Sequence, residues 1–260
     1  MLGLGRARVL PLLGVGLVSG FFAGLFGIGG GLVIVPALVV LLRLEQKLAA
    51  GTSLLAILPA ASIAAATYAL EGSVDWLVAG LLAVGAILGA QIGARLLQRI
   101  PRRGLQWIFV GFVAVMIVQL LLVLPDRSAA PVIDLTRGAG LVALGLVAGL
   151  LSAILGIGGG GVVVPVLMVW FGLGDLDAKG ASLVMMLPGV ISGLVANGRR
   201  HNVAVRAGLV VGASSLVSSP LGAWVAHLIP AQAGAWLFAG FLAFVGASML
   251  REALRPSSVK

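Results

Sequence analysis

The sequence predicts an all-α polytopic membrane protein built from two inverted-topology repeats. Each repeat holds a glycine-broken, re-entrant helix pair and three transmembrane helices, about 8–10 membrane segments in all. The first observation is composition, since 60% of the 260 residues are hydrophobic, 10% are charged, and the mean hydropathy is +1.19. A chain of this size cannot hide that much apolar surface from water, which excludes soluble enzymes, secreted domains and disordered proteins. The second is a series of long apolar runs, and the third is a duplication whose loop charges are exchanged between the copies.

Residues 9–124 are predicted to form the first membrane repeat. Its five apolar runs are Val9–Phe26, Leu32–Leu42, Ala50–Leu70, Trp76–Leu97 and Leu105–Leu124. At 1.5 Å per residue, most of these helices cross, or nearly cross, about 30 Å of hydrocarbon. The second run reaches only about halfway, which favours a re-entrant hairpin with the first run over a full span.

Residues 125–137 are predicted to be a polar linker, and residues 138–250 to form the second membrane repeat. The five runs of this repeat are Ala139–Leu155, Val162–Phe171, Ala181–Ala196, Ala207–Leu228 and Ala233–Leu250. The second run is again too short to cross the bilayer.

The two repeats are copies of one unit. Gly20–Leu38 reads GFFAGLFGIGGGLVIVPAL and Gly149–Leu167 reads GLLSAILGIGGGGVVVPVL, at an offset of 129 residues (149 − 20). The same offset holds without gaps downstream, where Ile100-Pro101 falls on Ile229-Pro230. A duplication of this kind predicts two structurally equivalent halves.

The charges of equivalent gaps predict that these halves are inverted. The gap between the third and fourth runs contains Glu71 and Asp75 in the first repeat, whereas its counterpart contains Arg199, Arg200 and Arg206. The next gap reverses the pattern, with three arginines in the first repeat and none in the second. Because Lys and Arg in short loops mark the cytoplasmic side, we expect equivalent loops on opposite sides, both termini in the cytoplasm and the linker outside.

Glycine runs separate the first two helices of each repeat, at Gly27–Gly31 and Gly156–Gly161. Consecutive glycines end a helix, and the next helix then presents free backbone amides at its positive end. Such amides bind anions, and inverted entry would bring both helix ends to one midplane site. The alternative is that the glycines only allow helices to pack closely. A nucleotide site is excluded by the absence of a preceding strand and of a GK[ST] ending. The predicted substrate-binding glycines are Gly29, Gly30, Gly31, Gly158, Gly159 and Gly160.

Polar residues within the predicted helices form a second group of candidates, because hydroxyls and amides can orient an oxyanion. They are Thr52, Ser53, Ser182, Gln91, Ser218, Ser219 and Asn197. For each of them, a hydrogen bond back to the helix's own carbonyls is an alternative role. Four prolines are predicted to kink helices, namely Pro36, Pro59, Pro165 and Pro188. Charged residues such as Asp175 and Lys179 fall at segment edges, so no carboxylate proton relay is predicted. The two histidines, His201 and His227, are too few and too scattered to indicate a metal site, and no cofactor is predicted.

The paired GxGGG-xxxx-P elements, the GTSL box at Gly51–Leu54 and the inverted duplication resemble the TauE/SafE sulfite exporter family, also called TSUP. The resemblance covers nearly the whole chain. It implies a secondary transporter in the bacterial inner membrane that moves a small, often sulfur-containing anion such as sulfite, sulfoacetate or a related sulfonate, by alternating access around a midplane site. The chain departs from an exact repeat at Ala181, the counterpart of Thr52. A functional role of the threonine hydroxyl would therefore be limited to the first repeat.

Two other functions stay open from the residues alone. A passive anion channel would have the same architecture, and Gly-Ala-Ser steps such as Gly180-Ala181-Ser182, with two histidines, loosely resemble a serine hydrolase. The hydrolase is disfavoured because small-Ser steps are ordinary in membrane helices. The net charge of +9 comes from basic residues in the short gaps between apolar runs, where they set the orientation of the chain in the membrane. Nucleic-acid binding is disfavoured because the sequence has no basic face with interleaved aromatic residues. The expected partners are therefore a small anion and the lipid bilayer, with a homo-oligomer left open.

Overall fold

The structure, a computed structural model, describes residues 6–122 and 135–254, and these residues form ten α-helices without a strand. The helices are α1 (Arg6–Phe26), α2 (Gly31–Leu41), α3 (Gln46–Leu70), α4 (Trp76–Arg99), α5 (Arg102–Leu122), α6 (Leu135–Leu155), α7 (Gly160–Trp170), α8 (Asp175–Gly198), α9 (Val205–Leu228) and α10 (Ala231–Leu254). Each predicted apolar run therefore corresponds to one helix, and the predicted all-α class is confirmed.

Three helix starts differ from the prediction by four residues or more, and one of them is α3, which begins at Gln46 rather than Ala50. Helix α8 begins at Asp175 rather than Ala181, because Asp175 and Lys179 lie one helical turn apart and pair across 3.2 Å. Acidic residues in a first turn also favour the positive end of a helix. Helix α6 begins at Leu135, so the last residues of the predicted 125–137 linker are helical, while residues 123–134 lie outside the described part of the chain.

Seven of the described helices are long and apolar enough to cross a membrane, namely α1, α3, α4, α6, α8, α9 and α10. Helices α2 and α7 have 11 residues each, about 16 Å of rise, and so reach only about halfway across a bilayer. Large apolar side chains are exposed on the flanks, including Leu10 at 76%, Val217 at 69% and Phe244 at 72%. Together these features confirm a polytopic membrane protein.

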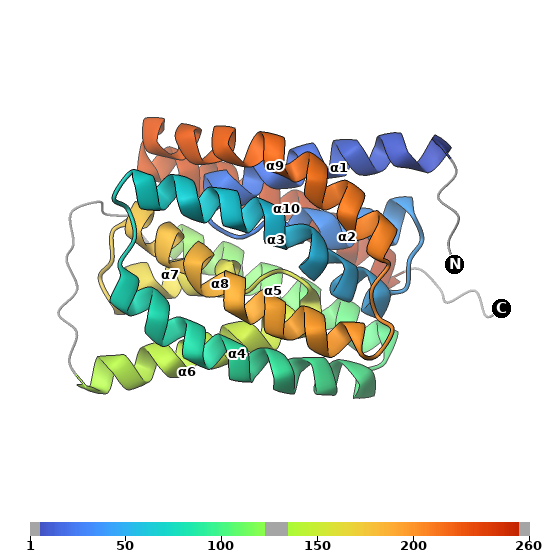
Figure 1. The fold of residues 1–260 in the computed structure, drawn as a ribbon, viewed down its shortest axis with the longest axis horizontal. Helices are drawn as coiled ribbons and strands as arrows, with labels where there is room; N and C mark the ends of the chain where they lie inside the picture. Colours follow the sequence, from blue (N-terminus) through green and yellow to red (C-terminus); the bar gives the residue numbers. More distant parts are fainter. Residues whose placement is uncertain (1–5, 123–134, 255–260) are drawn as a thin grey trace.

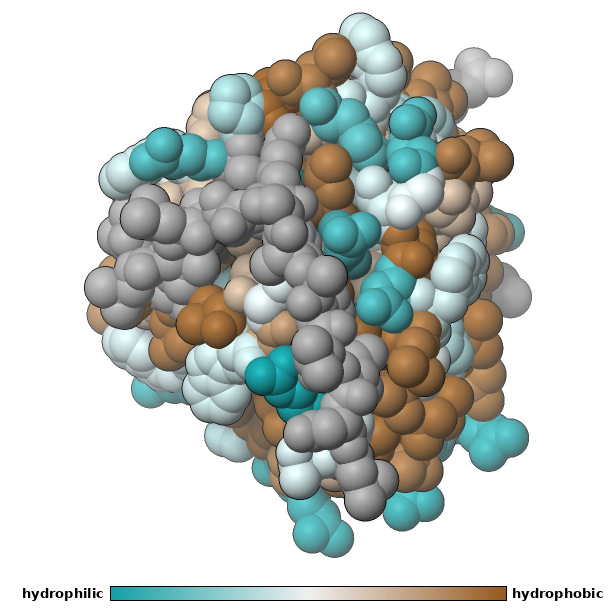
Figure 2. All heavy atoms as spheres, turned by 90° about the vertical axis from the view of Figure 1, so that its left-hand side faces the viewer, coloured by the Kyte–Doolittle hydropathy of each residue, from teal (hydrophilic) through white to brown (hydrophobic). Residues whose placement is uncertain are grey.

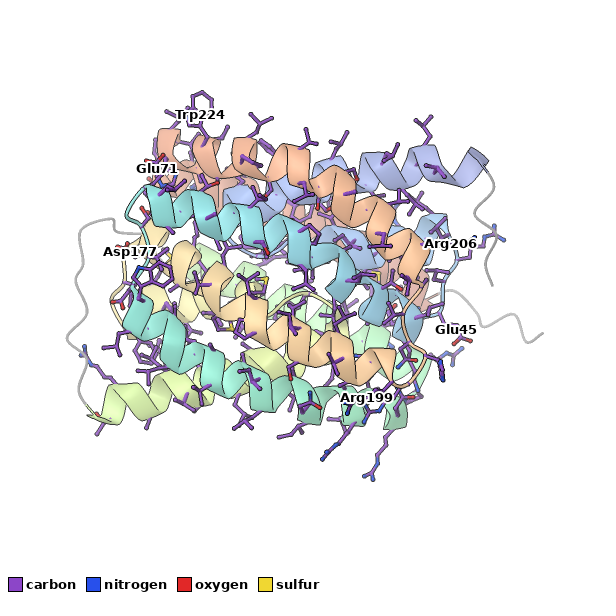
Figure 3. The ribbon with its side chains drawn as sticks, viewed as in Figure 1. Glu45, Glu71, Asp177, Arg199, Arg206 and Trp224 are labelled. Carbon is purple, nitrogen blue, oxygen red and sulfur yellow. The ribbon has the colours of Figure 1, made fainter. Side chains whose placement is uncertain are left out.

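The long helices run roughly parallel between two ends of the molecule (Figure 1). One end, on the right of Figure 1, holds the start of α1, the end of α10 and the loop between α8 and α9. We call it the basic end, because Arg199 and Arg206 lie there, although Glu45 does too (Figure 3). The opposite end holds the loop between α3 and α4 with Glu71, and the start of α8 with Asp177 (Figure 3). We call it the acidic end; hydrophilic side chains interrupt its hydrophobic surface (Figure 2).

The closest helix packing joins one half of the chain to the other. Helix α1 packs along α9, and the equivalent helix α6 packs along α4. Helices α3 and α8 also contact each other, as do α5 and α10. The two halves are thus intertwined rather than separate globular units.

Glycine makes these crossings possible. A Cβ atom on Gly20 of α1 would overlap the backbone carbonyl of Ser215 on α9, and one on Gly89 of α4 would overlap that of Leu146 on α6. Both glycines sit in runs spaced four residues apart, the small-residue spacing that lets membrane helices approach at backbone distance.

Candidate functional site

Each short helix begins at a left-handed glycine turn. The turn before α2 places Gly29 at φ 71° and Gly30 at φ 78°, and the turn before α7 places Gly158 at φ 84° and Gly159 at φ 87°. Residues with a Cβ atom rarely adopt these angles, so the sequence GxGG is required by the backbone itself. We refer to residues 27–31 and 156–160 as the central turns.

The two central turns lie against each other. A Cβ atom on Gly160 would stand 2.5 Å from the carbonyl oxygen of Gly27, and one on Gly31 would overlap the carbonyl of Gly156. The predicted glycines Gly29, Gly30, Gly31, Gly158, Gly159 and Gly160 are therefore brought together, three from each half of the chain. A predicted packing role also holds at Gly30, where a Cβ atom would stand 2.5 Å from the carbonyl oxygen of Ser19. Close packing against α1 therefore requires a glycine at position 30.

Two predicted serines join the turns to the opposite half. The Ser53 hydroxyl on α3 donates a hydrogen bond to the carbonyl of Gly156 at 2.5 Å, and the Ser182 hydroxyl on α8 donates to the carbonyl of Gly27 at 3.1 Å. Both serines are fully buried. Because they occupy equivalent repeat positions, each half fixes the turn of the other half by the same contact.

Backbone amides in the central turns are available for a ligand. In α2 the first backbone N–H with a carbonyl acceptor is that of Val33, and in α7 it is that of Val162. Among the described residues, the amides between Ile28 and Leu32 have no backbone acceptor. Free amides at the positive end of a helix are the groups that bind anions.

The thioether of Met186 on α8 lies against both turns. A Cβ atom on Gly158 would stand 2.6 Å from its Sδ atom, and one on Gly29 would overlap it. Ile57, which occupies the equivalent position in α3, also contacts Gly29. Both side chains are fully buried. They place an apolar lining beside the amides of the turns.

A buried ion pair flanks the turn before α2 on the side of the acidic end. The Cα, Cβ and Cγ atoms of Lys179 would all lie within 3 Å of a Cβ atom on Gly27. The Nζ atom of Lys179 pairs with Asp175 at 3.2 Å, and their side chains are 11% and 3% exposed. The sequence placed both residues at a segment edge, but the helix start at Asp175 brings Lys179 to the turn.

The remaining predicted residues bond elsewhere. Thr52 accepts a hydrogen bond from the backbone N–H of Ala204, which ties α3 to the loop before α9. Asn197 accepts one from Asn202 at 3.3 Å within the same loop region. Gln91 donates to the hydroxyl of Ser192 at 2.9 Å and so joins α4 to α8.

Ser218 and Ser219 lie where α9 packs against the first half of the chain. The Ser219 hydroxyl donates to the carbonyl of Ala60 on α3 at 2.8 Å. The Ser218 hydroxyl lies within 2.5 Å of the Cβ position of Gly20, and donates to the carbonyl of Ser215 at 3.4 Å. The Ser219 bond thus joins α9 to α3, whereas the Ser218 bond returns to a carbonyl of its own helix.

The four predicted kink prolines all lie inside continuous helices. Pro36 and Pro165 are the sixth residues of α2 and α7, and Pro59 and Pro188 lie in the middle of α3 and α8. Each removes one backbone donor from its helix, which weakens the helix locally.

Met186, Ile57 and Lys179 are residues of the site that the sequence did not indicate. Nothing in the pattern of α8 distinguishes Met186 from the other apolar residues of a membrane helix. The signal that was available for Lys179 was its charge four residues after Asp175, in a helix whose one other charged residue is Asp177.

Both halves of the chain match a single family model, "Sulfite exporter TauE/SafE", over residues 3–120 and 141–260. A "Probable membrane transporter protein" of Haemophilus influenzae is 30% identical over 260 residues, covering 93% of this chain and 97% of that protein. Shorter matches include YunE of Bacillus subtilis, 34% identical over 35% of this chain and 33% of that protein. A protein of Xylella fastidiosa is 41% identical over 33% of each chain. Both are likewise named probable membrane transporter proteins. No solved structure matches the chain.

Proposed function

The chain belongs to the sulfite exporter TauE/SafE family, and on that premise we propose that it is a secondary transporter of a small oxyanion. Sulfite, sulfoacetate and related sulfonates are the candidate substrates, and the bacterial inner membrane is the expected location. The observation that carries the proposal is the meeting of two glycine turns from opposite halves, each at the start of a helix with free amides. Two positive helix ends facing one point favour an anion and disfavour a cation.

Lys179 supports the choice of an anion. Its side-chain stem lies against Gly27, and its ammonium group, paired with Asp175, is buried where charge interactions are strong. In the bound state an oxyanion would accept hydrogen bonds from the turn amides, and it would share the ammonium group of Lys179 with Asp175. Met186 and Ile57 would limit its size.

Alternating access is the mechanism that the repeat arrangement supports. We infer that the halves have inverted topology, since the equivalent loops with Glu71 and Arg199 lie at opposite ends of the molecule (Figure 3). Inverted repeats with broken helices at the midplane are the common architecture of secondary transporters. In such an architecture, one half rocks against the other and opens the site to each side in turn.

The first experiment reconstitutes the full chain in liposomes and measures uptake of sulfite and sulfoacetate against an organic cation of similar size. A carrier coupled to a proton or sodium gradient accumulates the anion above its equilibrium level. Uptake that only dissipates the anion's own gradient would identify the channel instead. If no oxyanion of the panel moves while the cation does, the proposal is wrong.

A second measurement does not depend on coupling. Under the proposal, millimolar oxyanion raises the thermal unfolding midpoint of the purified protein, because a ligand that binds only the folded state stabilises it. An organic cation at the same ionic strength should have no such effect. Stabilisation by the cation alone would contradict anion binding.

The serine-hydrolase alternative finds no support in the hydroxyl contacts. Among the described residues, the serines of the three Gly-Ala-Ser steps, Ser182, Ser214 and Ser248, donate to backbone carbonyls. The serine near a histidine is Ser73, 3.5 Å from Nε2 of His227, whose Nδ1 atom faces the carbonyl of Ala223. This arrangement lacks the carboxylate that orients a catalytic histidine.

A further inference from the structure

Three arginines line a groove at the basic end of the molecule, between α4 and α8. The groove has a volume of about 400 Å³ and is lined by Ile92, Arg95, Leu96, Arg99 and Arg200. Arg95 and Arg99 lie one turn apart at the end of α4, and Arg200 lies just past the end of α8. We call these five residues the arginine groove.

The positive charge of the groove is not neutralised by the protein. Within the parts of the chain that the structure describes, none of the three arginines pairs with a carboxylate. Arg200 uses one Nη1 donor for the carbonyl of Ala196, at 2.6 Å. The remaining guanidinium donors are available to an anion with several oxygens, such as a phosphate.

The groove is apolar on the side toward the middle of the molecule. Ile92 precedes Arg95 and Leu96 precedes Arg99, each by three residues along α4, and they are 46% and 40% exposed, as expected of residues that face lipid. A soluble anion would contact only the arginines. A phospholipid matches both parts, with its phosphate at the charged rim and an acyl chain along the apolar residues.

The duplication provides an internal comparison, because the same groove positions recur at the acidic end. At the 129-residue offset, Arg95 and Arg99 correspond to Trp224 and Leu228, and Arg200 corresponds to Glu71. Trp224 and Glu71 lie near that end of the molecule (Figure 3). The shared scaffold therefore does not by itself require arginines.

Topology alone also does not explain the arrangement. The preference for Arg on the cytoplasmic side requires only that arginines lie near the helix ends, as Arg199 and Arg206 do. It does not require three of them, from two helices, to converge on one groove with an apolar wall.

We propose that the arginine groove binds an anionic phospholipid of the cytoplasmic leaflet, with the headgroup phosphate on Arg95, Arg99 and Arg200 and an acyl chain along Ile92 and Leu96. This lipid site is separate from the central turns and does not depend on which anion is transported.

The test counts phosphatidylglycerol and phosphatidylcholine retained by the full-length protein, using native mass spectrometry after titration with mixed micelles. The double variant Arg95→Gln/Arg99→Gln is compared with Arg206→Gln, a control that removes an exposed arginine at the same end but outside the groove. One arginine near an anionic headgroup changes binding roughly fivefold, so the double variant should bind phosphatidylglycerol about 25-fold more weakly. The control variant should bind it as the wild type does.

Three results would overturn the proposal: equal retention of the two lipids by the wild type, an unchanged double variant, or an equal loss in Arg206→Gln. If the double variant does not fold, the single variants Arg95→Gln and Arg99→Gln are measured instead, with a loss of about fivefold expected for each. A further measurement adds inorganic phosphate as a competitor of phosphatidylglycerol. If millimolar phosphate displaces phosphatidylglycerol completely, the groove is a site for soluble anions and not for a lipid.

Discussion

Lys179 is the side chain whose charge bears most directly on binding at the central turns, since its stem packs against Gly27 and its amine pairs with buried Asp175. Removing the lysine alone would leave a buried carboxylate without its pair, which is strongly destabilising in itself. The charge of Lys179 is therefore best tested in a background where Asp175 is also neutral.

We expect the double variant Asp175→Asn/Lys179→Gln to need a concentration of oxyanion at least about tenfold higher for half-maximal transport, because a charge-assisted contact is lost. Uptake kinetics in liposomes measure this change. The single variant Lys179→Arg, which keeps the positive charge, should retain most of the wild-type affinity for the oxyanion. An unchanged half-saturating concentration in the neutral pair would show that Lys179 does not face the substrate.

The buried side chain of Met186 is expected to limit the size of the anion that fits beside the central turns. The change Met186→Ala removes the thioether beside Gly29 and Gly158, and we expect it to favour a bulky sulfonate over sulfite because space opens beside the turns. Met249→Ala is the matched control, since Met249 is equally buried but lies on α10. Both variants should lose about 2–5 kcal/mol of stability. Only Met186→Ala should alter the ratio of transport rates for the two anions, and an unaltered ratio would remove Met186 from the site.

At the scale of single elements, the helix pair α1 and α9 depends on glycines whose neighbours the structure identifies. A Cβ atom on Gly20 would overlap the Ser215 carbonyl, whereas a Cβ atom on Gly14 of the same helix meets nothing within 4 Å. We expect Gly20→Leu to lower the thermal unfolding midpoint and the yield of monodisperse protein in detergent, because α1 must move away from α9. Gly14→Leu should leave both unchanged. Equal behaviour of the two variants would mean that α1 does not pack on α9 in the membrane.

The helices themselves were largely predictable, and the contacts between them were not. Long apolar runs and the glycine runs between them located all ten helices, but α8 was predicted to begin at Ala181 because its polar first turn reads as a loop. The bonds of Ser53 and Ser182 to the opposite turns join residues more than a hundred positions apart. The repeat indicated that these serines are equivalent, yet only the packing shows what each one contacts. The bond of Gln91 to Ser192 was not predictable for the same reason, because the local sequence does not reveal which helix packs beside α4.

At the scale of the whole molecule, the charges of the loops at the two ends predict how the protein is oriented in the membrane. The basic end with Arg199 should face the cytoplasm, and the acidic end with Glu71 should face outward. Arg103 lies at the start of α5, directly after the end of α4 with Arg99, and is expected on the cytoplasmic side too. The chain contains no cysteine, so single substitutions can be labelled without background. A reagent that does not cross membranes should label Glu71→Cys in intact cells, but Arg199→Cys and Arg103→Cys only after permeabilisation. Labelling of Arg103→Cys from outside would contradict the inverted arrangement.

The pairing of α1 with α9 and of α4 with α6 has a consequence for how the protein is made. The ribosome completes α1 and α4 before it synthesises their partners α9 and α6. The glycine-rich faces of α1 and α4 are therefore in the bilayer for a time without the helices that cover them in the folded protein. Membrane insertion and tertiary assembly are therefore separate stages, and the second depends on release of the last helices. The first half translated alone should insert with its native topology yet remain sensitive to protease, and it should become resistant when the second half is supplied as a separate chain.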